Sequence, residues 1–585
     1  MGKLLVYLKD YKKESVLGPF FKLLEASFEL IVPLVMAAII DKGVANADQP
    51  YIMQMCLVLI LLAVIGLTCS ITAQYFAAKA AVGFSTGLRH ALFEHIQTLS
   101  FSEMDTVGTS TLITRMTSDI NQTQNGVNLV LRLFLRSPFI VFGAMIMAFT
   151  IDVRAALIFV VTIPLLSIVV FGIMLMSIPL YKKVQSALDK VLGITRENLT
   201  GSRVIRAFNK EEDEIENFNE SNDALTKIQL YVGKISALMN PLTYVIINGA
   251  IVVLVWTGAI RVNDGAITQG EVVALVSYMS QILVELIKLA NLIININKSI
   301  ACGNRIQAIF ELQPSITDSA VAPAAVEERT SGADVPEVVF SHVGLTYAGA
   351  GEESLTDIDF TVKKGETIGI IGGTGSGKSS VVNLIPRFYD ATKGSIQIEG
   401  KDVREYSLEE LREKIGMVLQ KAVLFKGTIR ENMLWGNENA TDEDIMQALE
   451  IAQAKEFVDK KEGGLDFEIE QGGKNLSGGQ RQRMTIARAV VKKPDILILD
   501  DSASALDFAT DAKLRMAIRD MENKAAVFIV SQRAASIMYA DKIIVLDDGQ
   551  IVGIGTHEEL LQQCEVYQEI YYSQFKKNED AKEGR

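Results

Sequence analysis

A glycine-rich segment with one lysine and a terminal serine is the part of the chain best suited to bind phosphate. It comprises Gly372, Gly373, Thr374, Gly375, Ser376, Gly377, Lys378 and Ser379, and it matches the pattern G-x-x-x-x-G-K-[ST] throughout. In such a loop the backbone amides face the phosphates, the lysine neutralises charge and the last hydroxyl can bind Mg²⁺. A buried strand, 367–371, precedes the loop and a helical run, 381–387, follows it. We therefore predict that this loop, with the adjoining Ser380, binds a nucleoside triphosphate.

Two adjacent carboxylates follow a second buried strand and could hold a metal ion beside the phosphate loop. Residues 496–499 are Ile-Leu-Ile-Leu, and Asp500 and Asp501 come directly after them. A carboxylate at the end of a strand beside a phosphate loop is a recurring Mg²⁺ ligand. We therefore predict ATP and Mg²⁺ as ligands, with Ser379 and Asp500 on the metal.

The elements that position these residues occupy only part of the chain, because the two halves differ in composition. The 585 residues carry a net charge of −13. Residues 1–315 hold 25 Lys and Arg against 24 Asp and Glu, whereas residues 316–585 hold the remaining 32 and 46. The acidic excess of the second half disfavours nucleic acid as a partner. We predict a first domain over 1–315, a proline-containing linker over 316–336 and a second domain over 337–585.

Long uncharged stretches predict that the first domain spans a membrane. Three of them, 52–78, 155–181 and 235–260, contain 27, 27 and 26 residues without an ionisable side chain. Each exceeds the roughly 20 residues needed to cross a hydrocarbon core. Three more apolar stretches, near 16–40, 128–150 and 272–297, are interrupted by a few charges. Six membrane-spanning helices follow from this pattern.

The charges between the spans predict the orientation of the chain. The short loops after the first, third and fifth spans hold only Lys42, Arg154 and Arg261, whereas the segments on the other side hold 18 Lys and Arg. Basic residues gather on the cytoplasmic side of membrane proteins, so we expect both termini in the cytoplasm. The first 16 residues lack the pattern of a cleaved signal and are typical of an amphipathic helix on the membrane surface.

Ionisable side chains inside the spans are candidates for function. Glu25 and Glu29 are one helical turn apart, and Glu285 is spaced to pair with Lys288. We expect Glu25, Glu29 and Glu285 either to line a substrate cavity or to make structural polar contacts. Arg132 and Arg136 are expected to reach the inner interface.

A further motif resembles the signature of the ATP-binding-cassette (ABC) transporters. It comprises Leu476, Ser477, Gly478, Gly479 and Gln480, and a helical run follows it. Tyr347 resembles the family's adenine-stacking aromatic residue, and Gln420 its Mg²⁺-contacting glutamine. Residues 504–507, Ser-Ala-Leu-Asp, resemble the loop that crosses between two cassettes, and we place Asp507 among the catalytic residues.

Nearly the whole chain resembles an ABC exporter half-transporter. The implied fold is an α-helical membrane domain of the type I exporter class with six spans, followed by an α/β P-loop nucleotide-binding domain. The resemblance also implies dimerisation, because in this family the phosphate loop of one cassette holds ATP against the signature of the other. The long inner loops would carry short transverse helices near 108–116 and 205–215 that contact the cassettes.

Two positions depart from the family pattern at the centre of the chemistry. Asp501 stands where the family usually has glutamate, the base that aligns the attacking water, and Gln532 stands where it usually has histidine. Asp is one methylene shorter than Glu, and a glutamine amide carries neither a proton nor a positive charge. We therefore predict a site that binds ATP but hydrolyses it poorly, as in the degenerate-site subunit of bacterial heterodimeric multidrug exporters.

The predicted function is export of hydrophobic or amphiphilic compounds, such as drugs, by a heterodimer with a second half-transporter. This chain would supply an intact signature to the partner's site. Two alternatives stay open: a homodimeric lipid or peptide exporter with slow hydrolysis, and a regulatory ATP-binding membrane subunit.

Overall fold

The computed structural model describes residues 2–318, 335–502 and 505–575, and it separates into two compact units. The first unit contains residues 1–98 and 109–312, and the second contains residues 99–108 and 313–585. The segment 99–108 lies between two membrane helices in the sequence but belongs to the second unit. A division of the sequence at 315 did not anticipate this.

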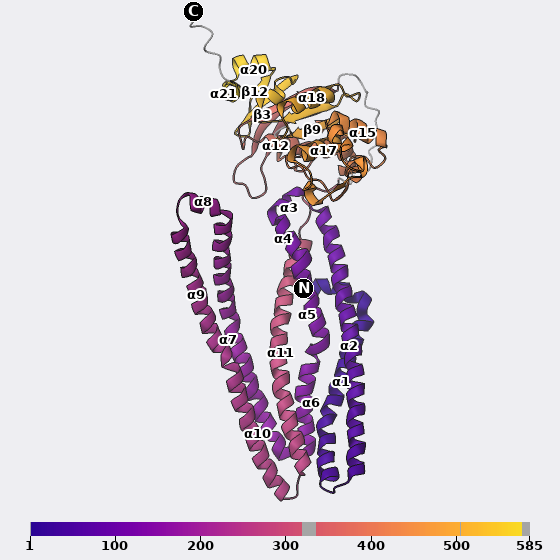
Figure 1. Ribbon diagram of the computed structural model, residues 1–585, viewed down its shortest axis with the longest axis vertical. Helices are drawn as coiled ribbons and strands as arrows, with labels where there is room; N and C mark the ends of the chain where they lie inside the picture. The colour runs from indigo at the N-terminus through magenta and orange to yellow at the C-terminus, as the bar shows by residue number, and fades with distance from the viewer. Residues whose placement is uncertain (1, 319–334, 503–504, 576–585) are drawn as a thin grey trace, which may run out of the picture. The chain divides into compact units, whose positions relative to one another are not determined.

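The first unit is helical (Figure 1), and its described helices are α1 (Lys12–Ala38), α2 (Gln49–Thr98), α4 (Thr109–Thr114), α5 (Ile120–Leu129), α6 (Arg136–Ile151), α7 (Val153–Thr200), α8 (Ser202–Ala207), α9 (Glu211–Ala237), α10 (Met239–Asn263) and α11 (Gln269–Phe310). Short 3-10 and π-helical segments join several of them into longer rods. Six of these rods are long and apolar enough to cross a bilayer: Gly2–Val44, Gln49–Thr98, Thr109–Ile151, Val153–Thr200, Glu211–Asn263 and Gln269–Phe310. The prediction of six spans is confirmed within the described residues.

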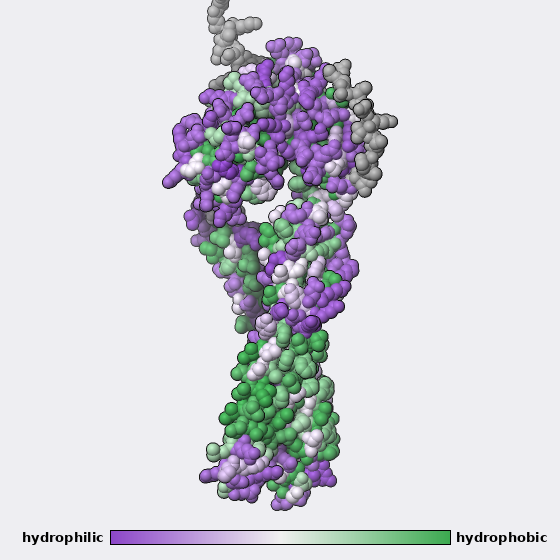
Figure 2. Space-filling view, turned by 90° about the vertical axis from the view of Figure 1, so that its right-hand side faces the viewer, coloured by the Kyte–Doolittle hydropathy of each residue, from purple (hydrophilic) through white to green (hydrophobic). Residues whose placement is uncertain are grey.

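Exposed apolar side chains form a belt on the face of these helices that Figure 2 shows. On this face hydrophobic residues gather along the middle of the bundle, and hydrophilic residues lie beyond them at both ends. Alanine and small side chains bring α1 and α2 close together, as Ala26, Ala73 and Ala77 are fully buried or nearly so. The belt is the surface that a bilayer would cover.

A four-charge cluster joins three membrane helices inside the bundle. Arg136 on α6 lies 2.7 Å from Glu285 on α11 and 2.6 Å from Glu29 on α1. Glu285 also pairs with Lys288 at 2.9 Å, as its spacing predicts, and accepts a hydrogen bond from Ser137 at 2.8 Å. The expectation that Arg136 reaches the inner interface is wrong, because two carboxylates from neighbouring helices hold its guanidinium in the interior.

The candidate cavity carboxylates therefore all have ion-pair partners. Glu25 pairs with Lys22 at 2.6 Å, and the side chain of Glu285 is 3% exposed. Of the two carboxylates in the four-charge cluster, Glu29 is the more accessible, with 40% of its side chain exposed.

The second unit contains three sheets and the helices that cover them. The strands are β1 (Val338–Leu345), β2 (Leu355–Val362), β3 (Thr367–Gly372), β4 (Lys393–Ile398), β5 (Lys401–Asp402), β6 (Ile415–Val418), β7 (Gly427–Thr428), β8 (Glu468–Ile469), β9 (Ile496–Asp500), β10 (Ala526–Val530), β11 (Lys542–Asp547) and β12 (Gln550–Gly555). The helices are α3 (Phe101–Val107), α12 (Lys378–Leu384), α13 (Leu408–Glu413), α14 (Ile429–Leu434), α15 (Asp442–Ile451), α16 (Lys455–Asp459), α17 (Gly478–Val490), α18 (Phe508–Arg519), α19 (Ala534–Ile537), α20 (His557–Gln563) and α21 (Glu565–Gln574).

The central sheet has the strand order β12-β11-β3-β10-β9-β6, and its strands from β11 to β6 run parallel. Helices cover both of its faces, and buried apolar residues form one core on each face. A second sheet has the order β2-β1-β4-β5, and β7 pairs with β8. Apolar runs such as 496–499 are fully buried, as expected for strands covered on both sides.

Short helices lie at or beside both ranges that the sequence analysis gave for the inner loops. The first range, 108–116, contains α4. Helix α3 precedes this range and ends where Gly108 takes a φ of +80°. Its start carries a capping box between Ser100 and Glu103, a local pattern that could have located it. The second, expected near 205–215, is α8, which begins directly after Gly201.

Replacing Arg136 with methionine should destabilise the folded chain strongly. Removal of one partner from a buried ion pair leaves carboxylates without compensation and typically costs about 3–5 kcal/mol. We expect a lower thermal unfolding temperature in detergent or nanodiscs. Arg132→Met is the matched control, since Arg132 lies one turn away and makes no ion pair with the residues the structure describes. Equal shifts for both variants would contradict the structural role of the cluster.

Candidate nucleotide-binding site

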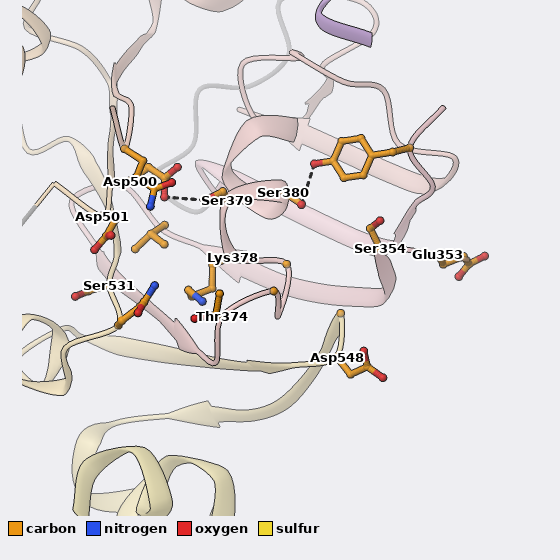
Figure 3. A pocket seen from close by; sticks show the side chains of 17 residues that line it. Glu353, Ser354, Thr374, Lys378, Ser379, Ser380, Asp500, Asp501, Ser531 and Asp548 are labelled. Carbon is orange, nitrogen blue, oxygen red and sulfur yellow. Dashed lines mark hydrogen bonds between the residues drawn. The ribbon is translucent and has the colours of Figure 1, made fainter. Parts of the chain in front are cut away.

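The predicted phosphate loop and both predicted carboxylates line one pocket of about 400 Å³ in the second unit (Figure 3). Its residues come from the carboxyl ends of β3, β9 and β10 and from the segments around β1, β2, β6 and β12. The sequence-predicted residues that line it are Tyr347, Thr374, Gly375, Gly377, Lys378, Ser379, Ser380, Gln420, Asp500, Asp501 and Gln532.

The sheet register explains why these segments meet. Ile370 pairs with Val530, and Val530 pairs with Asp500, so the strands β3, β10 and β9 end side by side. The phosphate loop follows the first strand, Gln532 follows the second, and Asp501 follows the third. A crevice at the carboxyl ends of parallel strands is the usual ligand site of open α/β sheets.

Two glycines of the phosphate loop are required by its conformation. Gly375 and Gly377 have φ values of +88° and +92°, a region that side chains disfavour. A Cβ at Gly377 would also lie 2.6 Å from Cδ2 of Leu355. The loop therefore turns tightly into α12, whose amino end faces the pocket and attracts anions.

Lys378 folds back onto its own loop. Its Nζ donates to the carbonyl oxygens of Gly372 and Gly373 at 3.0 and 2.5 Å and to Oγ of Ser376 at 3.3 Å. Burial lowers the pKa of Lys378, while the nearby Asp501 and Asp500 act in the opposite direction. This ammonium is desolvated beside the open pocket, a position in which phosphate oxygens can replace the carbonyls.

Ser379 and Asp500 meet as the metal prediction requires. The hydroxyl of Ser379 donates to Oδ1 of Asp500 at 3.0 Å, and Asp500 is 4% exposed. Burial raises the pKa of Asp500, the hydrogen bond from Ser379 lowers it, and the carboxylate of Asp501 raises it further. A cation would relieve this cost. Hydroxyl, carboxylate and amide oxygens of Ser379, Asp500 and Gln420 form the all-oxygen set that Mg²⁺ prefers, so these residues fit the ion.

Tyr347 lies at the opposite side of the pocket. Its hydroxyl donates to Oγ of Ser380 at 2.9 Å, and its ring packs edge-on against Tyr389 with centroids 5.0 Å apart. Burial raises the pKa of Tyr347, so the phenol stays neutral near physiological pH. The held ring provides a flat face at which a base could stack.

Asp501 and Gln532 occupy the two positions that depart from the family pattern. Asp501 has a φ of +46°, and its amide donates to the carbonyl of Val530 at 3.0 Å. The turn thus directs Asp501 away from the strand and into the pocket, beside Asp500 (Figure 3). A carboxylate in this position can orient a water molecule only if its reach suffices.

Several predicted residues do not line this pocket. The signature begins α17, where Ser477 caps the helix through the amide of Gln480, and both Ser477 and Gly478 are exposed. Asp507 caps α18 through the amide of Thr510, and Ser504 lies outside the described residues. Ser477, Gly478 and Asp507 are therefore accessible to another molecule, whereas Leu476 is buried.

Six pocket residues were not anticipated from the sequence: Glu353, Ser354, Val530, Ser531, Asp548 and Gly549. The last two form the two-residue turn between β11 and β12, and an Asp-Gly pair between apolar runs is a recognisable hairpin signal. Nothing local in the sequence indicates that this turn or Glu353 faces the phosphate loop.

Comparison with known proteins agrees with the geometry. Residues 15–286 match the family of ABC transporter transmembrane regions, and residues 355–504 match the ABC transporter family. An uncharacterized ABC transporter ATP-binding protein of Mycobacterium tuberculosis is 36% identical over 97% of each chain. YgaD of Bacillus subtilis, named provisionally as a multidrug export ATP-binding/permease protein, is 32% identical over 98% of each chain. An ATP-dependent lipid A-core flippase of Desulfotalea psychrophila is 33% identical over 83% of this chain and 84% of the relative.

A solved structure shares the fold. A bacterial Atm1-family ABC exporter with ATP bound superposes with a TM-score of 0.77, covering 97% of this chain and 99% of the other, at 21% identity. The expected fold class is confirmed.

Replacing Asp500 with asparagine should stabilise the nucleotide-free chain while weakening its response to Mg²⁺-ATP. Because its pKa is raised in the folded chain, protonated Asp500 favours the folded state. Its contribution to folding stability is complete below the pKa of about 3.9 in the unfolded chain, and it is lost as the pH rises through the pKa of the folded chain. Near neutral pH the variant avoids a buried charge and can still accept from Ser379.

We expect an unfolding temperature higher by about 2 °C, the shift that ~1 kcal/mol causes in a domain of 150–250 residues. The gain should shrink as pH falls towards ~4. Thermal scans with and without Mg²⁺-ATP measure both effects. An unchanged or lower unfolding temperature at neutral pH would show that ionised Asp500 does not destabilise the nucleotide-free chain.

Proposed function

The chain belongs to the ABC transporters and is an ATP-driven exporter of the bacterial plasma membrane, and from this premise we propose that it works as the degenerate-site subunit of a heterodimer. Its own pocket binds Mg²⁺-ATP, and its signature completes the catalytic site of a partner half-transporter.

One observation carries this proposal: the residues suited to binding are complete, while the two suited to hydrolysis are altered. Lys378 lies beside the pocket with its ammonium desolvated, and Ser379 already contacts Asp500. Lys378 would balance the charge of the terminal phosphates, and Tyr347 would hold the base. Bound Mg²⁺ would neutralise charge between the phosphate oxygens.

The altered positions limit what the chain can do to bound ATP. The carboxylate of Asp501 falls short of the position that a glutamate would reach, and Gln532 can donate a hydrogen bond without carrying charge. ATP is then held for longer than it takes a competent site to hydrolyse it. A site of this kind favours a closed dimer rather than turnover.

The position of the signature supports a partner. Ser477 and Gly478 are exposed at the start of α17, and neither lines the pocket that contains Lys378. A second cassette must therefore bring its phosphate loop to this surface for the signature to contact ATP. That partner would carry the glutamate and histidine that this chain lacks.

The substrates follow from the membrane unit and from its relatives. We propose hydrophobic or amphiphilic compounds, including drugs, in line with the provisional name of YgaD. Glu29, the accessible member of the ion-pair cluster, is the carboxylate best placed to meet a cationic group, whereas Glu25 and Glu285 are held by Lys22 and by Arg136 with Lys288. The flippase relative makes a lipid the competing substrate.

The purified chain alone should hydrolyse ATP slowly and should do so rapidly only with its partner. Loss of a general base accounts for roughly 10²–10⁴-fold, so we expect at least a ~100-fold difference in kcat. The measurement compares steady-state phosphate release in nanodiscs. Lys378→Met in this chain, and the equivalent change of the phosphate-loop lysine in the partner, identify the site responsible. Rapid hydrolysis by the chain alone would contradict the heterodimer and favour a homodimeric exporter.

The double change Asp501→Glu with Gln532→His should raise hydrolysis at this chain's own site by at least about tenfold, because it restores the reach and the charge of the two side chains. Asp548→Glu is the matched control, since it lengthens another pocket carboxylate by the same methylene. No increase in the double variant would show that other features silence the site. Transport into vesicles, tested with a cationic dye and with a fluorescent lipid, distinguishes an exporter of either class from a regulatory subunit.

A further inference from the structure

The last residue of helix α21 holds the loop that carries Gln532. Oε1 of Gln574 accepts a hydrogen bond from the amide of Ala534 at 2.9 Å, and Nε2 of Gln574 donates to the carbonyl of Gln532 at 2.7 Å. Both ends of one side-chain amide are thus used, on the two residues that flank Arg533. The opposite polarity of the two backbone groups fixes the orientation of the amide.

Helix α21 is firmly anchored, so it can act as a support. Tyr567 is fully buried in the core of the second unit, and its hydroxyl lies 2.7 Å from Nδ1 of His557 on α20. The rings of Tyr571 and Phe575 stack with centroids 4.6 Å apart and pack against the same core. Gln574 lies between these anchored residues at the end of the helix.

The loop is held on its other side as well. Arg533 stacks over Phe508 and donates to the carbonyl of Leu506 at 3.3 Å, and its amide donates to Oγ of Ser531 at 2.9 Å. The side chain of Gln532, in contrast, is exposed and forms no hydrogen bond with the rest of the described chain. The backbone therefore sets the direction in which its Cα–Cβ bond leaves the loop beside the pocket.

We propose that Gln574 is a positioning residue of the nucleotide site, which aims Gln532 at the terminal phosphate of ATP through the backbone of residues 532–534. This inference rests on the proposed role of Gln532. A neutral glutamine can only donate a hydrogen bond to a phosphate, and a hydrogen bond depends on direction more than a charge does. A chain with glutamine at this position depends more on such a support than one with a charged side chain.

The role predicts a specific defect in nucleotide discrimination. ADP lacks the terminal phosphate, so loss of the support should weaken ATP binding and leave ADP binding unchanged. The expected loss is about three- to tenfold in ATP affinity, the range of one net hydrogen bond. A general disturbance of the fold would weaken the binding of ATP and ADP alike.

The experiment measures ATP and ADP affinities of the full chain in nanodiscs, with Mg²⁺, by equilibrium titration. Gln574→Met keeps the length of the side chain and removes both hydrogen bonds. Gln568→Met is the matched control, because Gln568 is on the same helix but donates to Leu561 instead of the loop. Gln532→Ala and the double variant Gln532→Ala with Gln574→Met complete a double-mutant cycle, which measures the coupling between the two glutamines.

We expect Gln574→Met to lower the preference for ATP over ADP, Gln568→Met to leave it unchanged, and the double variant to match Gln532→Ala. An unchanged preference in Gln574→Met alongside a lowered one in Gln532→Ala overturns the support. An unchanged preference in Gln532→Ala overturns the proposed contact of Gln532 with the phosphate, which is a separate failure. Additive effects in the double variant would show that Gln574 does not act through Gln532.

Discussion

The nucleotide pocket depends on the parallel register of three strands, β3, β10 and β9. This pairing places Ile370, Val530 and Asp500 in one row, so the three segments that follow the strands emerge at one edge of the sheet. The phosphate loop, Gln532 and Asp501 are far apart in sequence and share the pocket only because of this row. A shift of one residue would interchange the side chains of a strand between the two cores, and both close-packed cores would have to repack.

The membrane unit solves a different problem, since its charges must be compensated without water. Arg136 is compensated by Glu285 and Glu29, and Asp152 beside the outer loop pairs with Arg261 at 2.7 Å while it caps α7. Such pairs contribute little net stability compared with apolar side chains, but they are costly to break. They therefore select which helices lie together. Residues 316–585, with 32 Lys and Arg against 46 Asp and Glu, carry the acidic excess, so the overall charge of −13 arises from the second unit.

Features that depend on local pattern could be predicted from the sequence. Three spans follow from uncharged stretches long enough to cross a bilayer, and three more follow from apolar stretches that a few charges interrupt. The phosphate loop follows from a pattern in which each residue type has its own physical reason. The strand before Asp500 was recognised from four apolar residues. Helix α3 was not predicted, although the capping pair Ser100 and Glu103 marks its start.

Features that depend on contacts between distant residues could not be predicted. Arg136 pairs with residues more than 100 positions away, and Gln574 meets Gln532 across 42 positions. Neither the residue types nor the helical periodicity of the sequence indicates these contacts, because they arise from how the elements pack. The pocket residues Asp548 and Gly549 belong to the same class: their turn was recognisable, but its place beside the phosphate loop was not.

The central claim is that this chain retains ATP while a partner hydrolyses it, and the nucleotide recovered from each subunit tests this most directly. The assembled transporter would be run through many turnovers with a radiolabelled azido-ATP, cross-linked by light, and the two subunits separated. The account predicts intact triphosphate on the chain with Asp501 and Gln532, and diphosphate on its partner. Diphosphate appearing on both subunits at the same rate would contradict it.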